Sequence, residues 1–274
     1  MSGAEREAVA AGVAALTAHA GRVQPEQLLA DAAQLLSVRD FFAGEPRLRR
    51  TLTDPARGAD DRAGLATQVL SGKVSDGVLE ITVVLTKQRW TFPSELLTGL
   101  ETVAVDALLI AGRAQGVLDE VEDELFRFGR IVDGDSELSA ALSSSGTSAK
   151  ARAELVRGLL SGKAGEITVQ LAAMAASGFA GRGFDTALRR LLELSADKRD
   201  ESIAYVTTAT ALPEDQEARL GARLSEIYGR SVSTKITVDP QVVGGIKVQI
   251  GHDLYDGTVA RRLSEARKAL AARR

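Results

Sequence analysis

The sequence predicts a mainly α-helical protein that ends in a small α+β module, and three observations lead to this fold class. Alanine and leucine are abundant while aromatic residues are only 4% of the 274 residues, a composition that favours helices packed through aliphatic side chains. Roughly the first 200 residues contain an internal repeat with helical periodicity. Beyond them, β-branched residues become frequent and the pattern changes to that of short strands.

The repeat appears when the sequence is shifted by 90 residues, which superimposes "RAGLATQVLSGK" at 62–73 on "RAELVRGLLSGK" at 152–163. Six leucines of the first stretch then coincide with six of the second: Leu28, Leu35, Leu48, Leu52, Leu65 and Leu70 with Leu118, Leu125, Leu138, Leu142, Leu155 and Leu160. Two copies are too few for a solenoid. We therefore expect a duplicated helical bundle, built either as two related bundles or as one elongated bundle, with copies at residues 1–106 and 107–199.

Each copy should contain four to six short helices. Apolar residues recur at three- and four-residue steps, which predicts one buried stripe per copy. Short polar breaks such as "TDPARGADD" and "SSSGTS" supply the connections. The stripe residues are Leu28, Ala32, Leu35, Val38 and Phe42 in the first copy, and Leu118, Val121, Leu125, Phe128 and Val132 in the second.

Residues 200–274 are expected to form a β-α-β-β-α module. "SIAYVTTA" at 202–209 is typical of a strand, and a helix follows between Pro213 and Gly229. Alternating apolar residues predict two more strands, and "TVARRLSEARKALAARR" closes the chain as a helix. The apolar positions are Leu220, Leu224 and Ile227 on the first helix, Val232, Ile236 and Val238 on the second strand, and Ile246, Val248 and Ile250 on the third.

Composition excludes several classes of function. The 34 Lys and Arg nearly balance the 37 Asp and Glu, so overall charge gives no reason to bind nucleic acid. There is no cysteine, which removes disulfides, thiol nucleophiles and thiolate metal sites and favours a cytoplasmic setting. The N-terminus does not resemble a secretory signal, and the apolar runs are too short to cross a bilayer. Any work at a membrane should therefore depend on a partner.

The most suggestive stretch for chemistry is "DPQVVGGIKVQIGHDLYDGTVARRL", which begins at Asp239. A phosphate site at Gly244–Gly245 would need these glycines to open a helix, but they lead into a strand, where positive φ or a close backbone approach is the expected use. A metal at His252, Asp253 and Asp256 is not favoured either, because their spacing matches no known metal loop. Asp256–Gly257 is a strong turn pair and predicts a hairpin after the third strand.

Other candidates also lack the parts of a reactive site. His19 is the only other histidine, so catalytic triads and histidine metal sites have no second member. The repeated "SGK" falls at predicted helix ends, where Gly and Lys suit capping. Trp90 could anchor a partner or pack within the bundle. Arg261 and Arg262 could contact an acidic partner or anionic lipid, or could lie on a solvated helix. We expect no enzyme, no cofactor and no metal.

Residues 204–263 resemble the C-terminal part of the delta subunit family of bacterial F-type ATP synthases, equivalent to the mitochondrial oligomycin-sensitivity-conferring protein. Thr258 stands where the family usually has Ser and keeps a capping hydroxyl, and His252 replaces an Asp. The matching positions are Ala211, Leu212, Asp239, Pro240, Gly244, Gly245, Gly251, Asp256, Gly257 and Leu263.

Upstream, "VLDEVEDELFRFGRIVDGDSELSAAL" resembles the N-terminal bundle of the same family, so about residues 107–274 are covered. The residues before them form an extra copy of the bundle, as in the enlarged delta subunits of actinobacteria. The resemblance implies a non-catalytic stator subunit that grips N-terminal segments of alpha subunits and the ends of the b stalk. It would lie peripherally at the cytoplasmic face of the plasma membrane, held through the complex. The alternative is a free adaptor that binds amphipathic helices outside the synthase.

Overall fold

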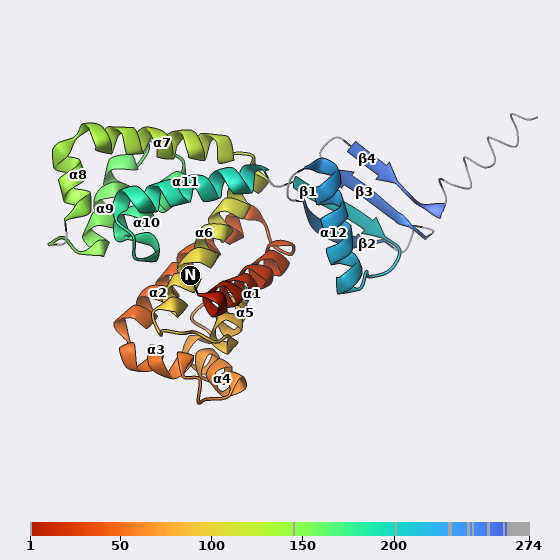
Figure 1. The fold of residues 1–274 in the computed structure, drawn as a ribbon, viewed down its shortest axis with the longest axis horizontal. Coiled ribbons are helices and arrows are strands. Elements are labelled where there is room, and N and C mark those ends of the chain that lie inside the picture. The colour runs from red at the N-terminus through yellow and green to blue at the C-terminus, as the bar shows by residue number, and fades with distance from the viewer. Residues whose placement is uncertain are drawn as a thin grey trace, which may run out of the picture. The chain divides into compact units, whose positions relative to one another are not determined.

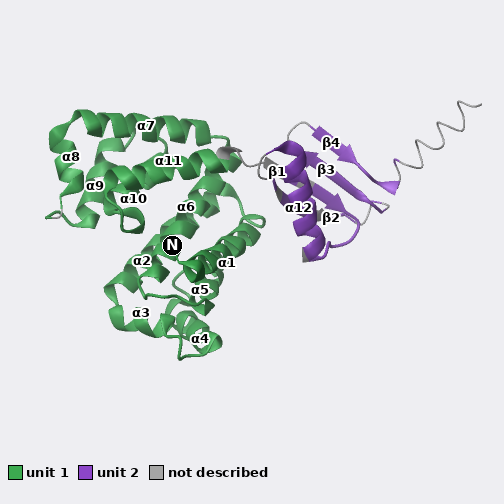
Figure 2. Cartoon of the chain, in the orientation of Figure 1, with its two compact units in different colours: residues 1–198 green, residues 199–274 purple. Residues whose placement is uncertain are grey.

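The computed structural model describes residues 2–144, 146–200, 202–229, 232–239, 242, 244–250, 253–259 and 261 (Figure 1). The chain divides into two compact units, residues 1–198 and residues 199–274 (Figure 2). Unit 1 is helical, and unit 2 combines a sheet with one helix. The predicted class, mainly helical with a small α+β module at the C-terminal end, is therefore confirmed.

Unit 1 contains eleven α-helices and a short 3₁₀ helix, η1, within the described residues. They are α1 (Gly3–Ala20), α2 (Pro25–Gly44), α3 (Pro46–Thr53), α4 (Ala59–Leu70), α5 (Asp76–Lys87), α6 (Glu95–Gln115), α7 (Leu118–Gly134), α8 (Ser136–Ser143), α9 (Ala149–Leu160), α10 (Glu166–Ser177), η1 (Phe179–Gly181) and α11 (Phe184–Asp200).

Local sequence explains where several of these helices begin and end. The hydroxyl of Ser2 accepts a hydrogen bond from the backbone N–H of Glu5 (3.1 Å), and the Glu5 carboxylate accepts one from the Ser2 N–H (3.2 Å), which forms a capping box at α1. Helices α6 and α10 end at Gly116 and Gly178, both in the left-handed conformation that glycine adopts without a steric penalty.

Helix bounds recur at the 90-residue shift found in the sequence. Helices α3, α4 and α5 have the same lengths as α8, α9 and α10, and each pair starts exactly one shift apart. The "SGK" glycines, Gly72 and Gly162, follow α4 and α9 with φ of 71° and 69°, so the predicted helix ends are confirmed. Helix α1 at 3–20 corresponds to residues 93–110, most of which lie in α6.

Helix α6 runs unbroken through the boundary predicted between residues 106 and 107. It packs against α1 and α2 of the first half and against α7, α10 and η1 of the second half (Figure 1). Its buried residues extend from Leu96 to Gly112, and all belong to one hydrophobic core with the rest of unit 1. Unit 1 therefore has no linker at residue 106, because one helix supplies core side chains to both halves.

The two predicted apolar stripes are confirmed. All five positions of each stripe are buried, on α2 in the first half and on α7 in the second. The adjacent residues Phe41 and Ile131, which correspond at the 90-residue shift, are instead 42% and 60% exposed. The periodicity thus identifies the inward face of each helix, and the same outward position carries an apolar side chain in both halves.

Unit 2 contains β1 (Ser202–Thr208), α12 (Glu214–Tyr228), β2 (Val232–Val238), β3 (Ile246–Ile250) and β4 (Asp253–Asp256). The strand order is β2-β1-β3-β4. Strand β1 is parallel to β2, which requires the crossover through α12, and β1–β3 and β3–β4 are antiparallel. A separate small core forms between the sheet and α12, from Ala204, Val206, Leu224, Val232, Val248 and Ile250.

Two details of unit 2 differ from the prediction. Strand β4 is a fourth strand, paired with β3 from Lys247↔Asp256 to Ile250↔Asp253. Ile227 was expected on the buried face of α12 but is 70% exposed, while Leu224 one turn earlier is buried. Most of the predicted last helix, residues 262–274, lies outside the described residues.

Within the described residues, no helix has both the length and the apolar character needed to cross a bilayer.

Candidate functional site

The paired glycines of the C-terminal motif bring two backbone segments into close contact. Gly244 and Gly245 have φ of 67° and 81°, in the left-handed region where glycine is favoured. The backbone N–H of Gly257 donates to the Ile246 carbonyl (2.9 Å), and that of Val259 donates to the Gly244 carbonyl (3.2 Å). A Cβ atom at Gly245 would lie only 2.4 Å from the Gly257 carbonyl oxygen. Both expected uses of the pair, positive φ and close approach, are present.

Asp256 and Thr258 direct the chain after β4. The Asp256 carboxylate accepts a hydrogen bond from the Thr258 N–H (3.0 Å), and the Thr258 hydroxyl accepts one from the Arg261 N–H (3.3 Å), as a helix N-cap does. Hydrogen bonding to Thr258, first through its side chain and then through its backbone, holds the pKa of Asp256 below its ordinary value. A lowered folded pKa stabilises the fold above the ordinary aspartate pKa, and this contribution is lost as pH falls through the folded value.

The hairpin predicted at Asp256–Gly257 lies elsewhere. Strands β3 and β4 pair with each other directly, so their connection falls between Ile250 and Asp253, and Asp256–Gly257 comes at the end of β4. Three motif residues, Pro240, Gly251 and His252, fall outside the described residues. Asp239 is described, and its N–H donates to the Thr208 carbonyl (2.8 Å). Among the described residues, no group of three His, Asp or Glu side chains could hold a metal ion.

A tyrosine pair that sequence reasoning missed joins α12 to β4. The Tyr228 hydroxyl lies 3.0 Å from a carboxylate oxygen of Asp253 and 3.1 Å from the Tyr255 hydroxyl. The hydrogen bond with Tyr255, together with burial and the Asp253 carboxylate, raises the pKa of Tyr228. On β4, the side chains of Leu254 and Tyr255 are each about half exposed. The contact holds the exposed edge strand against the helix.

The proposed partner-contact residues have different surroundings. Trp90 is buried, and its Nε1–H donates to the Leu85 carbonyl (2.9 Å). Gly99 makes room for the indole, since a Cβ there would lie 2.7 Å from the ring. Trp90 therefore packs within the bundle, and its use as an exposed anchor is corrected. Arg261 is exposed, and Arg262 lies outside the described residues.

An arginine performs the same task in both halves of unit 1. Arg62 donates through Nε to the Thr86 carbonyl (2.9 Å) and through Nη1 to the carbonyls of Asp54 (3.2 Å) and Arg57 (2.6 Å). Its Nη2 also donates to the carbonyls of residues 87 and 88. The guanidinium thus ties the end of α5 to the connection between α3 and α4.

The counterpart Arg152 makes the corresponding bonds, to the carbonyls of Ala176 (2.8 Å), Ser144 (3.0 Å) and Thr147 (2.6 Å). Each acceptor lies 90 residues after its equivalent in the first half. A second contact recurs in the same way, because the Gln34 side chain accepts from the Ser75 N–H (2.7 Å) and Glu124 accepts from the Gly165 N–H (3.0 Å). The shift found in the sequence therefore preserves specific hydrogen bonds.

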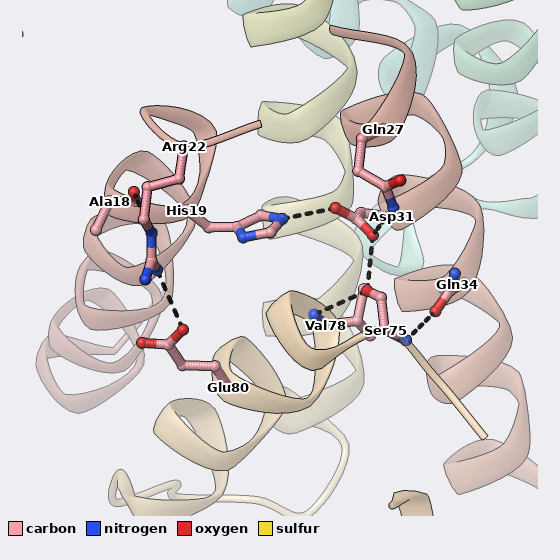
Figure 3. A network of polar contacts seen from close by, with 9 residues as sticks. All are labelled: Ala18, His19, Arg22, Gln27, Asp31, Gln34, Ser75, Val78 and Glu80. Carbon is pink, nitrogen blue, oxygen red and sulfur yellow. Dashed lines mark hydrogen bonds and ion pairs between the residues drawn. The ribbon is translucent and has the colours of Figure 1, made fainter. Parts of the chain in front are cut away.

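Asp31 is the centre of a polar network between α1, α2 and α5 (Figure 3). Its carboxylate is fully buried and accepts hydrogen bonds from His19 Nε2 (2.7 Å), Gln27 Nε2 (2.9 Å) and the Ser75 hydroxyl (2.8 Å). Ser75 in turn caps α5 by accepting from the Val78 N–H (3.3 Å). His19 thus has a structural partner in Asp31.

Replacing Asp31 with alanine should lower the free energy of unfolding by about 2–3 kcal/mol, because the donors of His19, Gln27 and Ser75 would lose a fully buried acceptor. Urea denaturation followed by far-ultraviolet circular dichroism measures this change. Glu80→Ala is the matched control, since its ion pair with Arg22 (3.2 Å) in the same region is exposed and should be worth less than about 1 kcal/mol. Equal losses of unfolding free energy in the two variants would contradict a stabilising role for the Asp31 network.

Glu101 on α6 joins the two halves of unit 1. Its buried carboxylate pairs with Arg39 on α2 and also accepts from the Ala180 N–H in η1 (2.9 Å). Burial of Arg39 by itself lowers the pKa of the guanidinium, but the carboxylates of Glu101 and Asp40 outweigh burial, so the pKa is raised. One side chain therefore links residues of the first half to residues of the second through α6.

These side chains indicate the class of protein. In the described ranges, buried polar side chains such as Arg62 and Glu101 bind backbone groups at helix ends and connections of the same chain. That arrangement is typical of a structural protein.

The comparisons with known proteins then identify the family. The family model "ATP synthase delta (OSCP) subunit" matches residues 105–270. The ATP synthase subunit delta of Salinispora arenicola is 54% identical over 94% of this chain and 94% of its own length, and that of Streptomyces griseus is 41% identical over 99% and 100%. The chain belongs to the ATP synthase delta (OSCP) subunit family.

The matches differ in how much of the chain they cover and in how similar they are to it. The alignments with the relatives cover nearly the whole chain, so they include most of the residues that precede the family model. A chain of the Toxoplasma gondii mitochondrial ATP synthase hexamer aligns with a TM-score of 0.28 and 16% identity, over 61% of this chain and 94% of that one. That likeness is too low to bear on the fold.

Proposed function

We propose that this chain is a non-catalytic subunit of the peripheral stalk of an F-type ATP synthase. It links the catalytic head to the stalk, so that the head does not rotate with the rotor. The observation that carries the proposal is family membership over nearly the whole chain, with 54% identity to a delta subunit. A single core that continues through unit 1 suits this role, because a stator part must resist torque without internal slack.

Within the complex, the helical unit grips N-terminal helices of alpha subunits and the sheet unit holds the ends of the b stalk. Exposed apolar side chains support both assignments, because such residues are typical of protein contact sites. Phe126 and Ile131 are 58% and 60% exposed on α7, and Val238 and Leu254 are 48% and 51% exposed on the sheet. The subunit is peripheral, at the cytoplasmic face of the plasma membrane, and is held there by its partners.

The helical unit is a duplicated bundle, and the delta family's usual N-terminal domain is its second copy. The recurring helix bounds and the matched bonds of Arg62 and Arg152 support this origin. The copies correspond to residues 1–106 and 107–199, with 200–274 as the stalk-binding module. Because α6 occupies the position of the last helix in one copy and the first helix in the next, the copies share an element instead of meeting at a linker.

Affinity purification from native membranes tests the stator role. The tagged full chain should recover the alpha and b subunits from solubilised membranes, whereas the free-adaptor alternative predicts recovery of neither. A photo-reactive amino acid at Ile131 should cross-link to alpha, and one at Leu254 should cross-link to b. Phe41 is the matched position in the first copy and reports whether the extra bundle also contacts alpha. Recovery of alpha with no cross-link from either bundle position would contradict the placement of alpha.

A further inference from the structure

The end of the first bundle copy carries a basic concave surface. Two adjoining hollows of about 380 and 340 Å³ share Pro55 and Arg57 in the connection between α3 and α4. The first hollow also includes Arg50 and Trp90, and the second includes Arg89. We call this surface, with its three arginines Arg50, Arg57 and Arg89, the basic hollow.

The three arginines are available to a ligand. All three are exposed, and none forms an ion pair with a carboxylate among the residues that the structure describes. The neighbouring cations are already used: Lys87 pairs with Asp60 (2.9 Å), and Arg62 donates to five carbonyls. The hollow therefore has a local excess of positive charge, although the whole chain has a net charge of -3.

The excess belongs to the first copy alone. At the 90-residue shift, Arg50, Arg57 and Arg89 correspond to Ala140, Thr147 and Phe179. The second copy has a hollow at the corresponding place, about 240 Å³ in volume, lined by Leu142, Arg152, Arg182 and Asp185 among others. There Arg152 is occupied by backbone carbonyls, and Asp185 offsets Arg182. The basic hollow also includes one carboxylate, Asp54, but its three arginines outnumber it. Since the fold is shared, the three arginines are not required by the bundle itself.

We propose that the basic hollow binds a carboxylate-rich segment of a partner protein. A guanidinium presents a planar pair of N–H donors that matches a carboxylate, and three of them around a concavity can hold several acidic side chains. A protein segment is favoured over a lipid surface because the arginines surround a recess, whereas membrane-binding clusters are larger, with four to eight cations that face a flat interface. This inference goes beyond the stalk role and does not rest on it.

Binding of fluorescein-labelled octaglutamate to the purified full chain, followed by anisotropy at low salt, tests the proposal. Arg57→Glu/Arg89→Glu should weaken binding about tenfold or more. Arg157→Glu/Arg189→Glu is the matched control, because both residues are exposed in the same unit, neither has an ion pair in the described part of the chain, and the change in net charge is identical. Trp90 is the only tryptophan and lines the hollow, so its fluorescence provides a local second readout.

The binding results distinguish an acidic-segment site from an effect of net charge and from a lipid or phosphate site. Weakening by the hollow variant alone, with a change in Trp90 emission on peptide addition, supports the proposal. Equal weakening by both variants would show that only net charge matters and would overturn it. A second result would also overturn the proposal. In that result, octaglutamate does not bind, whereas phosphatidylglycerol vesicles or inorganic phosphate bind and lose this binding when Arg57 and Arg89 are replaced. Circular dichroism confirms folding, and Arg57→Gln/Arg89→Gln, which avoids new charge repulsion, should give intermediate weakening.

Discussion

Arg62→Ala is expected to lower the free energy of unfolding of the helical unit by about 3 kcal/mol. Its side chain is buried, and five carbonyls at the end of α5 and before α4 would lose their donor. Urea denaturation monitored by Trp90 fluorescence measures the effect, because Trp90 bonds to the Leu85 carbonyl in the same region.

Two comparisons sharpen this experiment. Arg62→Lys keeps the charge but cannot reach several carbonyls in a fixed fork, so it should recover only part of the loss. Arg152→Ala removes the counterpart in the second copy, where three carbonyl bonds are made and the side chain is less buried, so a smaller loss is expected. A loss below about 1 kcal/mol for Arg62→Ala would mean that water satisfies these carbonyls.

Gly245→Ala is expected to destabilise the sheet unit by about 3 kcal/mol or more. Positive φ alone costs a non-glycine residue about 1–2 kcal/mol, and the new Cβ would also lie 2.4 Å from the Gly257 carbonyl oxygen. That oxygen belongs to the backbone and cannot rotate away, so the segments 244–246 and 257–259 would have to separate.

Gly229→Ala is the control for this change. Gly229 has φ of 64° at the end of α12, but no atom lies within 4 Å of a Cβ there, so only the conformational cost of about 1–2 kcal/mol applies. All three tyrosines lie in the sheet unit and the single tryptophan in the helical unit, so near-ultraviolet spectra of the full chain report the units separately. Equal losses for the two glycine variants would contradict the close approach at Gly245.

Periodic and conformational signals in the sequence predicted much of this structure. The stripes on α2 and α7 follow from helical spacing, because burial of one face is what makes such spacing recur. The positive φ of Gly244 and Gly245 follows from a glycine pair placed directly before a strand. Both features are local, and in each the residue type alone restricts the backbone.

Features that depend on distant neighbours could not be predicted in this way. Spacing places Ile227 on the same face as Leu224, but it does not show that Leu224 is buried while Ile227 is 70% exposed. Strand β4 is short and has aspartate at both ends, a residue type that strands disfavour, so only its pairing with β3 defines it. Trp90 is buried because Gly99, on the following helix, leaves space for its ring.

The structural role of Arg62 could have been inferred from the sequence. Arg62 and Arg152 coincide at the 90-residue shift, and an arginine carries several donors but no acceptor, so one shared structural task in both halves could be expected. The division into copies at residues 1–106 and 107–199 stays a prediction, and helix α6 runs unbroken through its boundary. A repeat defines corresponding positions, and it does not require that the copies be independent.

The shared helix has a mechanical consequence for a protein under torque. Helix α6 has 21 residues and is therefore about 30 Å long, a continuous rod whose backbone hydrogen bonds run from one bundle copy into the other. A force applied to either copy passes along this rod and through the Glu101 contacts, without a hinge that could absorb it. Helix α6 thus joins the two halves of the helical unit without a flexible joint between them.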